Sequence, residues 1–118
     1  MTPDDERASE IAYTDFAKVD MRVGRIVTAE PFPQARNPAY KLTVDFGPLG
    51  VKRSSAQITK HYRPDELVGR LVVAVVNFPP RQIATVMSEV LILGAVPETG
   101  DVVLLHPDLD VPLGTRIA

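Results

Sequence analysis

Alternating and continuous runs of apolar residues divide the chain into short strands. The stretch LTVDF at 42–46 alternates apolar and polar side chains, which is the pattern of a strand buried on one face. Residues 71–78, LVVAVVNF, are almost all apolar, so we expect a strand buried on both faces. The other predicted strands are 21–30, 51–58 and 88–95, with two extra short strands in 102–108 and 111–118.

Capping and turn residues predict where the chain is not extended. Thr2 as N-cap and Pro3 at the first helical position predict a helix over 2–12, and Thr14 is a second N-cap candidate before a short turn. TKHYRPDELVG at 59–69 predicts a short helix between the third and fourth strands. Gly24, inside the first strand, indicates a bulge or a sharp bend there.

The order of these elements predicts the fold. Three strands, a short helix and two further strands are typical of the OB-fold, a five-stranded Greek-key barrel. We therefore expect an all-β protein with a minor helical part: an N-terminal helical arm at 1–13 and a barrel domain at 14–118 with extra C-terminal strands. OB-folds bind ligands on the face of strands 2 and 3, between two loops that here are 31–40 and 78–87.

Composition narrows the chemistry of the chain. Its 118 residues contain no cysteine, which excludes disulfides, thiol nucleophiles and cysteine-based metal sites. Neither His61 nor His106 has partners at a metal-ligand or catalytic-triad spacing, so we expect no enzyme activity, no metal and no cofactor. No apolar run is long enough to span a membrane, and the start MTPDDERASE is unlike a secretory signal. We expect a cytoplasmic protein.

Positive charge gathers in the middle of the chain although the net charge is −2. Eight of the 13 lysines and arginines lie within residues 36–81, with only three of the 15 acidic residues. They could be ordinary solvated charges, but on the predicted fold they indicate a groove for an anionic ligand. The candidate ligand-binding residues are Lys41, Lys52, Arg53, Gln57, Asn77, Arg81 and Ser88.

Three residues beside this groove have alternative roles. Asn77 could contact the ligand or bond the backbone of its own loop. Ser88 could donate to the ligand or simply begin a strand. Phe78 is expected to plug the barrel, with stacking on a ligand as the alternative.

Several segments resemble a known family. FAKVDMRVGRI, AYKLTVDFG and LVGRLVVAVVNFPPRQIATVMSEVLILG are similar to the tRNA-binding domain, which is appended to some aminoacyl-tRNA synthetases and also occurs alone. The resemblance covers roughly residues 14–118. Within the family, AEPFPQARNPAYKLTVDFG, SSAQIT and VVNFPPRQIA resemble the export-related CsaA chaperones. This implies an OB-fold homodimer that holds unfolded polypeptides and cooperates with the SecA translocation motor.

The resemblance carries over residue by residue and departs at one element. Asn77, Pro80, Ser88 and Glu89 match the family pattern, whereas the Val90-Leu91 pair replaces a glycine and a methionine beside the RNA site of the relatives. The bulkier apolar wall implies weaker tRNA binding and leaves room for a peptide. We therefore expect a non-enzymatic chaperone of unfolded or export-bound polypeptides, with a tRNA-binding protein acting in trans as the alternative.

Overall fold

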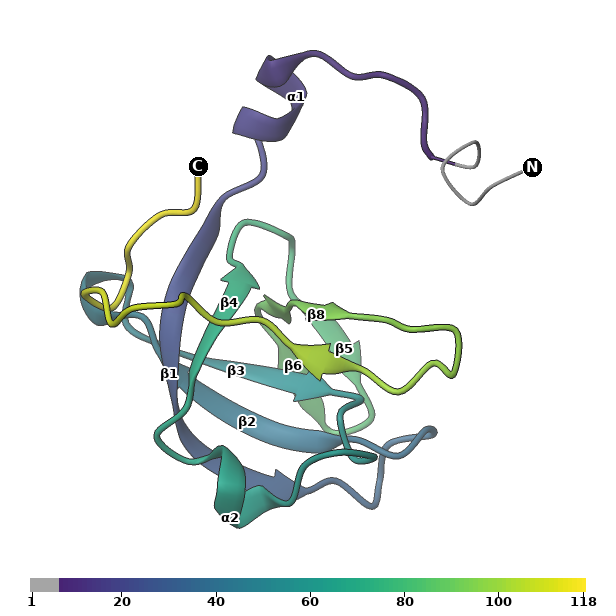
Figure 1. Cartoon of the computed structure of the whole chain (residues 1–118). Helices are drawn as coiled ribbons and strands as arrows, with labels where there is room; N and C mark the ends of the chain where they lie inside the picture. Colours follow the sequence, from purple (N-terminus) through teal and green to yellow (C-terminus); the bar gives the residue numbers. More distant parts are fainter. Residues whose placement is uncertain (1–6) are drawn as a thin grey trace.

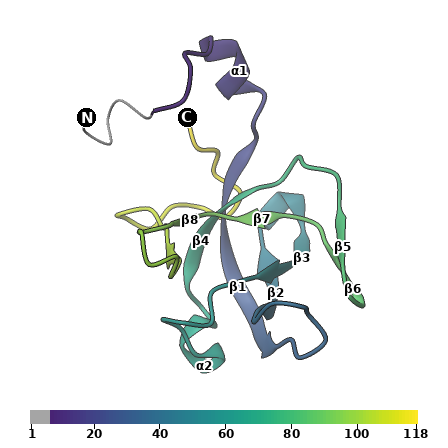
Figure 2. The same cartoon turned by 90° about the vertical axis from the view of Figure 1, so that its right-hand side faces the viewer.

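Five antiparallel strands form a sheet that curls into a small barrel in the computed structural model, which describes residues 7–118. They are β1 (Met21–Pro31), β2 (Tyr40–Asp45), β3 (Val51–Ala56), β4 (Leu71–Val75) and β7 (Leu91–Ile92). Their order along the sheet is β3, β2, β1, β4, β7, so β3 and β7 are the two edges that meet where the barrel closes (Figures 1 and 2). The predicted OB-fold is confirmed.

Shorter elements surround the barrel. They are α1 (Tyr13–Ala17), the 3-10 turn η2 (Gly47–Leu49), α2 (Pro64–Leu67), β5 (Arg81–Ile83), β6 (Val86–Ser88), β8 (Gly94–Ala95) and β9 (Val103–Leu104). The short helix predicted between the third and fourth strands is present as α2. One extra C-terminal strand pair, β8 with β9, is also present.

The core follows from the apolar patterns of the sequence. In and just after β2, Leu42, Val44 and Phe46 are almost completely buried, and every residue of β4 is buried. Leu67 of α2 is fully buried in the same cluster. The strand residues therefore supply an aliphatic core, as their alternation predicted.

Gly24 has a packing role rather than the predicted bulge. The register of β1 with β2 shifts between Ile26 and Thr28, not at Gly24. A Cβ atom at Gly24 would lie 2.6 Å from Val44 Cγ1 and 2.7 Å from Phe46 Cε1. Glycine is needed here because the core side chains of β2 press directly against the β1 backbone.

The N-terminal arm differs from its prediction. The helix predicted over 2–12 is wrong for residues 7–12, which are not helical, and its signals at Thr2 and Pro3 lie outside the described residues. The helix is α1 instead, because the Asp15 carboxylate accepts the Ala12 N–H at 3.1 Å while the Asp15 N–H donates to the Ala12 carbonyl. This helix projects beyond the barrel and contains no buried residue (Figures 1 and 2).

The C-terminal tail runs beside the beginning of β1. The Val23 N–H donates to the Thr115 carbonyl at 2.9 Å, and the Gly114 N–H donates to the Val23 carbonyl at 2.8 Å. Arg22 also donates from Nη1 to the Gly114 carbonyl, 92 residues further along the chain. The strand predicted over 111–118 is thus reduced to one isolated bridge, between Arg22 and Arg116, that still fixes the tail to the barrel.

Candidate binding groove

The connection after β4 is more ordered than the loop predicted for residues 78–87. It contains a β-hairpin in which β5 pairs with β6, with Arg81 opposite Ser88 and Ile83 opposite Val86. Ala84 in its turn has a φ of 49°, the left-handed conformation that disfavours side chains. The hairpin stands out from the sheet (Figure 2). Its residues Arg81, Ile83 and Ser88 line one side of a groove.

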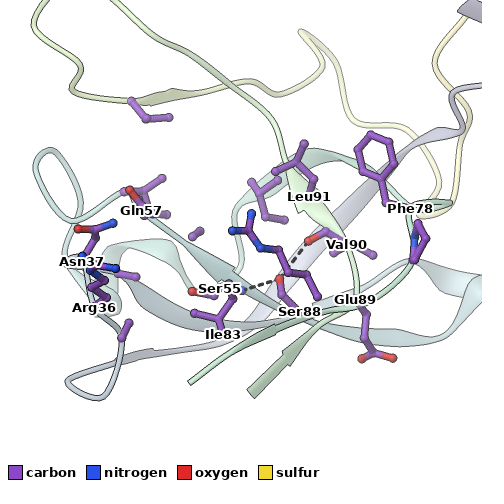
Figure 3. Close-up of a pocket in the computed structure, with 18 residues that line it drawn as sticks. Arg36, Asn37, Ser55, Gln57, Phe78, Ile83, Ser88, Glu89, Val90 and Leu91 are labelled. Atoms are coloured by element: carbon purple, nitrogen blue, oxygen red, sulfur yellow. Dashed lines mark hydrogen bonds between the residues drawn. The ribbon is translucent and has the colours of Figure 1, made fainter. Parts of the chain in front are cut away.

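This groove is the main candidate binding site. It has a volume of about 980 Å³. Its floor is the end of β3 and the residues just after it, 55–58, and its walls are the 35–39 loop, the hairpin, residues 89–92 and Val102 (Figure 3). Most lining side chains are apolar: Ala35, Ala39, Ala56, Ile58, Phe78, Pro79, Ile83, Val90, Leu91, Ile92 and Val102. A largely apolar groove with a few polar groups is suited to an extended ligand with apolar side chains.

Hydrogen bonds close the barrel at the edge of this groove. The Ser55 N–H donates to Ser88 Oγ at 3.0 Å, and the Ser54 hydroxyl donates to the Val90 carbonyl at 2.9 Å. Ser88 Oγ also lies 3.4 Å from the Val90 carbonyl, so it bridges the two edges (Figure 3). The Ser88 side chain therefore has a structural role in addition to lining the groove.

Arg53 holds the carboxylate of Glu89 away from the groove. Glu89 Oε1 accepts the Arg53 backbone N–H at 2.9 Å and lies 3.4 Å from Arg53 Nε. These bonds, first of all the backbone one, hold the pKa of Glu89 below its usual value, against desolvation that would raise it. Figure 3 shows its carboxylate pointing away from the other lining side chains.

The rim of the groove has a net positive charge. Arg36 and Arg81 line it, and neither forms an ion pair within the part of the chain that the structure describes. Among residues 7–118, Glu89 is the one acidic residue that lines it, and its charge is compensated by Arg53. The free positive charge at the rim would favour a ligand with carboxylates or phosphates.

The structure brings only part of the predicted site together. Gln57, Arg81 and Ser88 line the groove, whereas the other four predicted residues do not: Lys41, Lys52, Arg53 and Asn77. Lys41 Nζ lies over the Phe32 ring, 5.6 Å from its centroid. Arg53 bonds Glu89 as described above.

Asn77 bonds the backbone that follows α1. Its Oδ1 accepts the Asp20 N–H at 2.9 Å, and its Nδ2 donates to the Lys18 carbonyl at 2.7 Å. Both polar atoms of its amide are therefore used within the chain. The same part of the chain is also held by Arg116, whose Nη2 donates to the carbonyl of Ala17 at the end of α1 at 2.8 Å.

Sequence reasoning missed several lining residues. Arg36 and Asn37 lie in the proline-rich loop that was expected to border the site. Arg36 is one of the eight basic residues of the middle segment but was not among the candidate ligand-binding residues, and no pattern distinguished Asn37. Phe78 was expected to plug the barrel, and this is wrong: its side chain is 50% exposed and lines the groove. The two prolines that follow Phe78 could have indicated a stiff, exposed segment, in which Phe78 is not part of the core.

Neither a metal site nor a membrane-spanning helix is found in the part of the chain that the structure describes. Residues 7–118 contain no group of three histidine, cysteine, aspartate or glutamate side chains placed to hold a metal ion. Among the same residues, no helix has the length and apolar character needed to cross a bilayer.

Comparisons with known proteins agree with this barrel. Residues 21–116 match the family described as "Putative tRNA binding domain". The chaperone CsaA of Bacillus anthracis is 54% identical with a TM-score of 0.89, and the CsaA chaperone protein of Picrophilus torridus is 53% identical with a TM-score of 0.86. The alignments cover 93% and 92% of this chain and 100% of each of those chains.

A longer relative shares only this domain. Methionine–tRNA ligase 1 of Sorangium cellulosum is 42% identical over 110 residues, which are 93% of this chain but 16% of the ligase. The chain therefore belongs to the tRNA-binding domain family, within which it matches the CsaA chaperones.

Proposed function

We propose that this protein is a non-enzymatic chaperone that holds unfolded or export-bound polypeptides in the groove between β3 and the β5–β6 hairpin. The observation that carries the proposal is the groove itself, with its apolar walls and the unpaired Arg36 and Arg81 at its rim within the described residues. Extended chains with exposed apolar side chains and scattered carboxylates suit such a surface.

The groove wall favours a polypeptide over RNA. Val90 and Leu91 line it, and Leu91 is 50% exposed, so an aliphatic side chain faces the ligand. Aliphatic groups bury the side chains of an unfolded polypeptide well but offer a nucleobase neither stacking nor hydrogen bonds. Binding would be modest and tolerant of sequence, because most of it comes from apolar contact.

The alternative function is tRNA binding in trans. It is supported by the family match and by the similarity to one domain of methionine–tRNA ligases. In that case the arginines and lysines would contact phosphates, and affinity would fall steeply with salt because counterions are released on binding.

One pair of titrations tests both functions. Fluorescein-labelled α-lactalbumin, kept unfolded by reduction and carboxymethylation, and labelled bulk tRNA are each titrated with the protein at low and physiological salt, and anisotropy is recorded. The chaperone proposal expects micromolar binding of the unfolded protein that persists at physiological salt. Binding of tRNA alone, weakening steeply with salt, would replace it with the RNA alternative.

We also propose that the protein acts as a homodimer. Ile11 and Tyr13 on the projecting arm are 70% and 74% exposed, and a second copy could cover these apolar side chains. Two grooves on one particle would raise the avidity for a long unfolded chain. Direct contact with the SecA translocation motor, a cytoplasmic location and the division at residues 13 and 14 stay predictions from the sequence.

A further inference from the structure

One backbone edge of β3 runs along the floor of the groove. β2 pairs with the opposite edge, with Lys41 opposite Ser55 and Tyr40 opposite Ala56. Since β3 is the last strand at its end of the sheet, no strand from the described residues pairs with it on the groove side. Four successive residues, 55–58, line the groove, so main chain as well as side chains forms its floor.

The hydrogen bonds that close the barrel engage backbone groups of this β3 edge up to the Ser55 N–H, and none beyond it within residues 7–118. The Arg53 N–H and carbonyl both bond Glu89, and the Ser55 N–H bonds Ser88 Oγ. Every second residue of a strand directs its N–H and carbonyl groups to the same side. The Ser55 carbonyl and the N–H and carbonyl of Gln57 therefore point to the same side as the backbone groups of Arg53. Within residues 7–118, neither the Ser55 carbonyl nor the N–H or carbonyl of Gln57 has a hydrogen-bond partner on this side.

We propose that a bound polypeptide adds to β3 as an extra strand, pairing its main chain with Ser55 and Gln57. This inference rests on the proposed chaperone function and names how that site recognises its ligand. Unpaired strand edges bind extended peptides by main-chain hydrogen bonds, which do not depend on the peptide's sequence. An RNA strand lacks the regular alternation of donors and acceptors that this edge requires.

Side chains around the edge define the class of peptide. Ile83 and Leu91 line the groove beside it and would contact alternate apolar side chains of the added strand. Arg36 and Arg81 would pair with a carboxylate, because Glu89 is already bonded to Arg53. The expected ligand is therefore an extended segment in which apolar residues alternate with polar ones and that carries at least one acidic residue.

N-methylated peptides test the pairing directly. The probe is a fluorescein-labelled nonapeptide in which valine alternates with glutamate and threonine, together with two copies N-methylated either at the valines or at the polar residues. A strand paired along one edge uses the amides of one set only. We expect one methylated copy to lose at least about tenfold in affinity and the other to stay within about threefold.

The outcomes separate this inference from the proposed function. Equal affinities of the two methylated copies, whether retained or lost, would overturn strand addition while leaving peptide binding in place. If neither the unmodified peptide nor unfolded α-lactalbumin binds, the chaperone proposal itself fails. If bulk tRNA binds while neither the peptide nor unfolded α-lactalbumin does, the RNA alternative replaces the chaperone proposal and the inference fails with it.

A matched pair of variants tests the same edge on the protein. Gln57→Ala removes the side chain but keeps the backbone N–H, and we expect peptide affinity within about threefold of the parent. Gln57→Pro also removes the N–H, which makes no bond within the described chain, and should reduce affinity at least about tenfold. Equal affinities of two folded variants would contradict the inference. If the proline variant does not fold, the methylated peptides still decide.

Amide exchange gives an independent readout in the parent protein. The Gln57 N–H should exchange freely without ligand and at least about tenfold more slowly in the peptide complex, as followed by NMR. The Leu93 N–H, which already donates to the Val73 carbonyl at 2.9 Å, reports any general change in stability. Peptide binding that leaves Gln57 as exposed to exchange as before would overturn strand addition.

Discussion

Glu89 and Arg53 are bonded to each other through both main chain and side chain. The Glu89 N–H donates to the Arg53 carbonyl at 2.8 Å, and Glu89 Oε1 accepts the Arg53 N–H at 2.9 Å. The pair joins the edge of β3 to the segment before β7, where the structure of residues 7–118 has no regular ladder to close the barrel. Charge on the predicted fold indicated Arg53 as a ligand-binding residue, and Glu89 matched the family pattern, whereas their geometry gives both a role in closing the barrel.

Replacing Glu89 by glutamine should therefore destabilise the barrel at neutral pH. The neutral amide keeps an acceptor oxygen but loses the charge-assisted bond, which we expect to cost about 1–2 kcal/mol. Because folding lowers the Glu89 pKa, its stabilising effect is present above its ordinary value of 4.5 and is lost as pH falls through the folded value. Thermal unfolding from pH 7 to 3 should show the parent and variant melting temperatures converging at low pH.

The control for this comparison is Glu98→Gln, because Glu98 is exposed and its replacement changes the net charge equally. A constant difference between parent and Glu89→Gln down to pH 3 would contradict the assigned role of the charge.

Replacing Arg81 by alanine should weaken ligand binding without unfolding the protein. Arg81 is exposed at the groove rim and forms no ion pair within the described residues, so little stability depends on it. We expect roughly tenfold weaker binding of unfolded α-lactalbumin, about 1.4 kcal/mol, in an anisotropy titration. Lys60→Ala removes the same charge from an exposed position outside the groove and should bind like the parent. Equal losses in the two variants would point to a general charge effect.

Phe78 should contribute apolar contact to the ligand. Its side chain is half exposed in the groove, so Phe78→Ala removes binding surface while opening no cavity in the core. We expect at least threefold weaker polypeptide binding, about 0.7 kcal/mol, and a melting temperature within a few degrees of the parent. Leu49→Ala, at a site 40% exposed outside the groove, is the matched control. A large loss of melting temperature would instead assign Phe78 to the core.

The arm should mediate association of two copies. Sedimentation velocity at micromolar concentration should give a dimer for the parent and a monomer when Ile11 and Tyr13 are both changed to serine, because exposed apolar area is removed. Val68→Ser, at a 53% exposed position on the barrel, should leave the dimer intact. A monomeric parent would refute the proposed homodimer.

Glycine should be preferred at the turn of the β5–β6 hairpin. Ala84 has a φ of 49°, so Ala84→Gly relieves the conflict between its Cβ and the backbone and should stabilise the hairpin by up to about 1 kcal/mol. Thermal unfolding should show a rise of a few degrees. Thr85→Gly serves as the control, because Thr85 is outside the left-handed region and the same change there should be neutral or destabilising. A loss of stability in Ala84→Gly would mean that the Ala84 methyl group makes a contact worth more than the strain.

The sequence predicted the barrel because its core has a regular pattern. Leu42, Val44 and Phe46 repeat with the period of a strand, and each is buried as expected. The β5–β6 hairpin could not be predicted in the same way. Its strands have three residues each, too few for a period to emerge, and its turn uses Ala84 rather than the glycine or asparagine of common hairpins.

The candidate site was only partly predictable for a similar reason. The charge distribution indicated that the middle of the chain binds the ligand, and the predicted strand order indicated that strands 2 and 3 carry residues such as Arg53. Neither could show that Glu89 compensates Arg53 from 36 positions away, or that the Asn77 amide bonds the backbone of Lys18 and Asp20. Such pairings depend on how segments far apart in the sequence are placed against each other in the fold. The local pattern of apolar and charged residues does not encode that placement.

The contact between the C-terminal tail and β1 has a consequence for how the chain folds. Thr115 and Gly114 bond Val23 across more than ninety positions, so the first residues of β1, which precede the part paired with β2, have no partner on one side until residues 114–117 are available. Forming such distant contacts carries a large loop-closure entropy, and folding is expected to be slow for a chain of this size. A nascent copy of this protein would therefore expose the unpaired beginning of β1 to its surroundings until residues 114–117 have been synthesised.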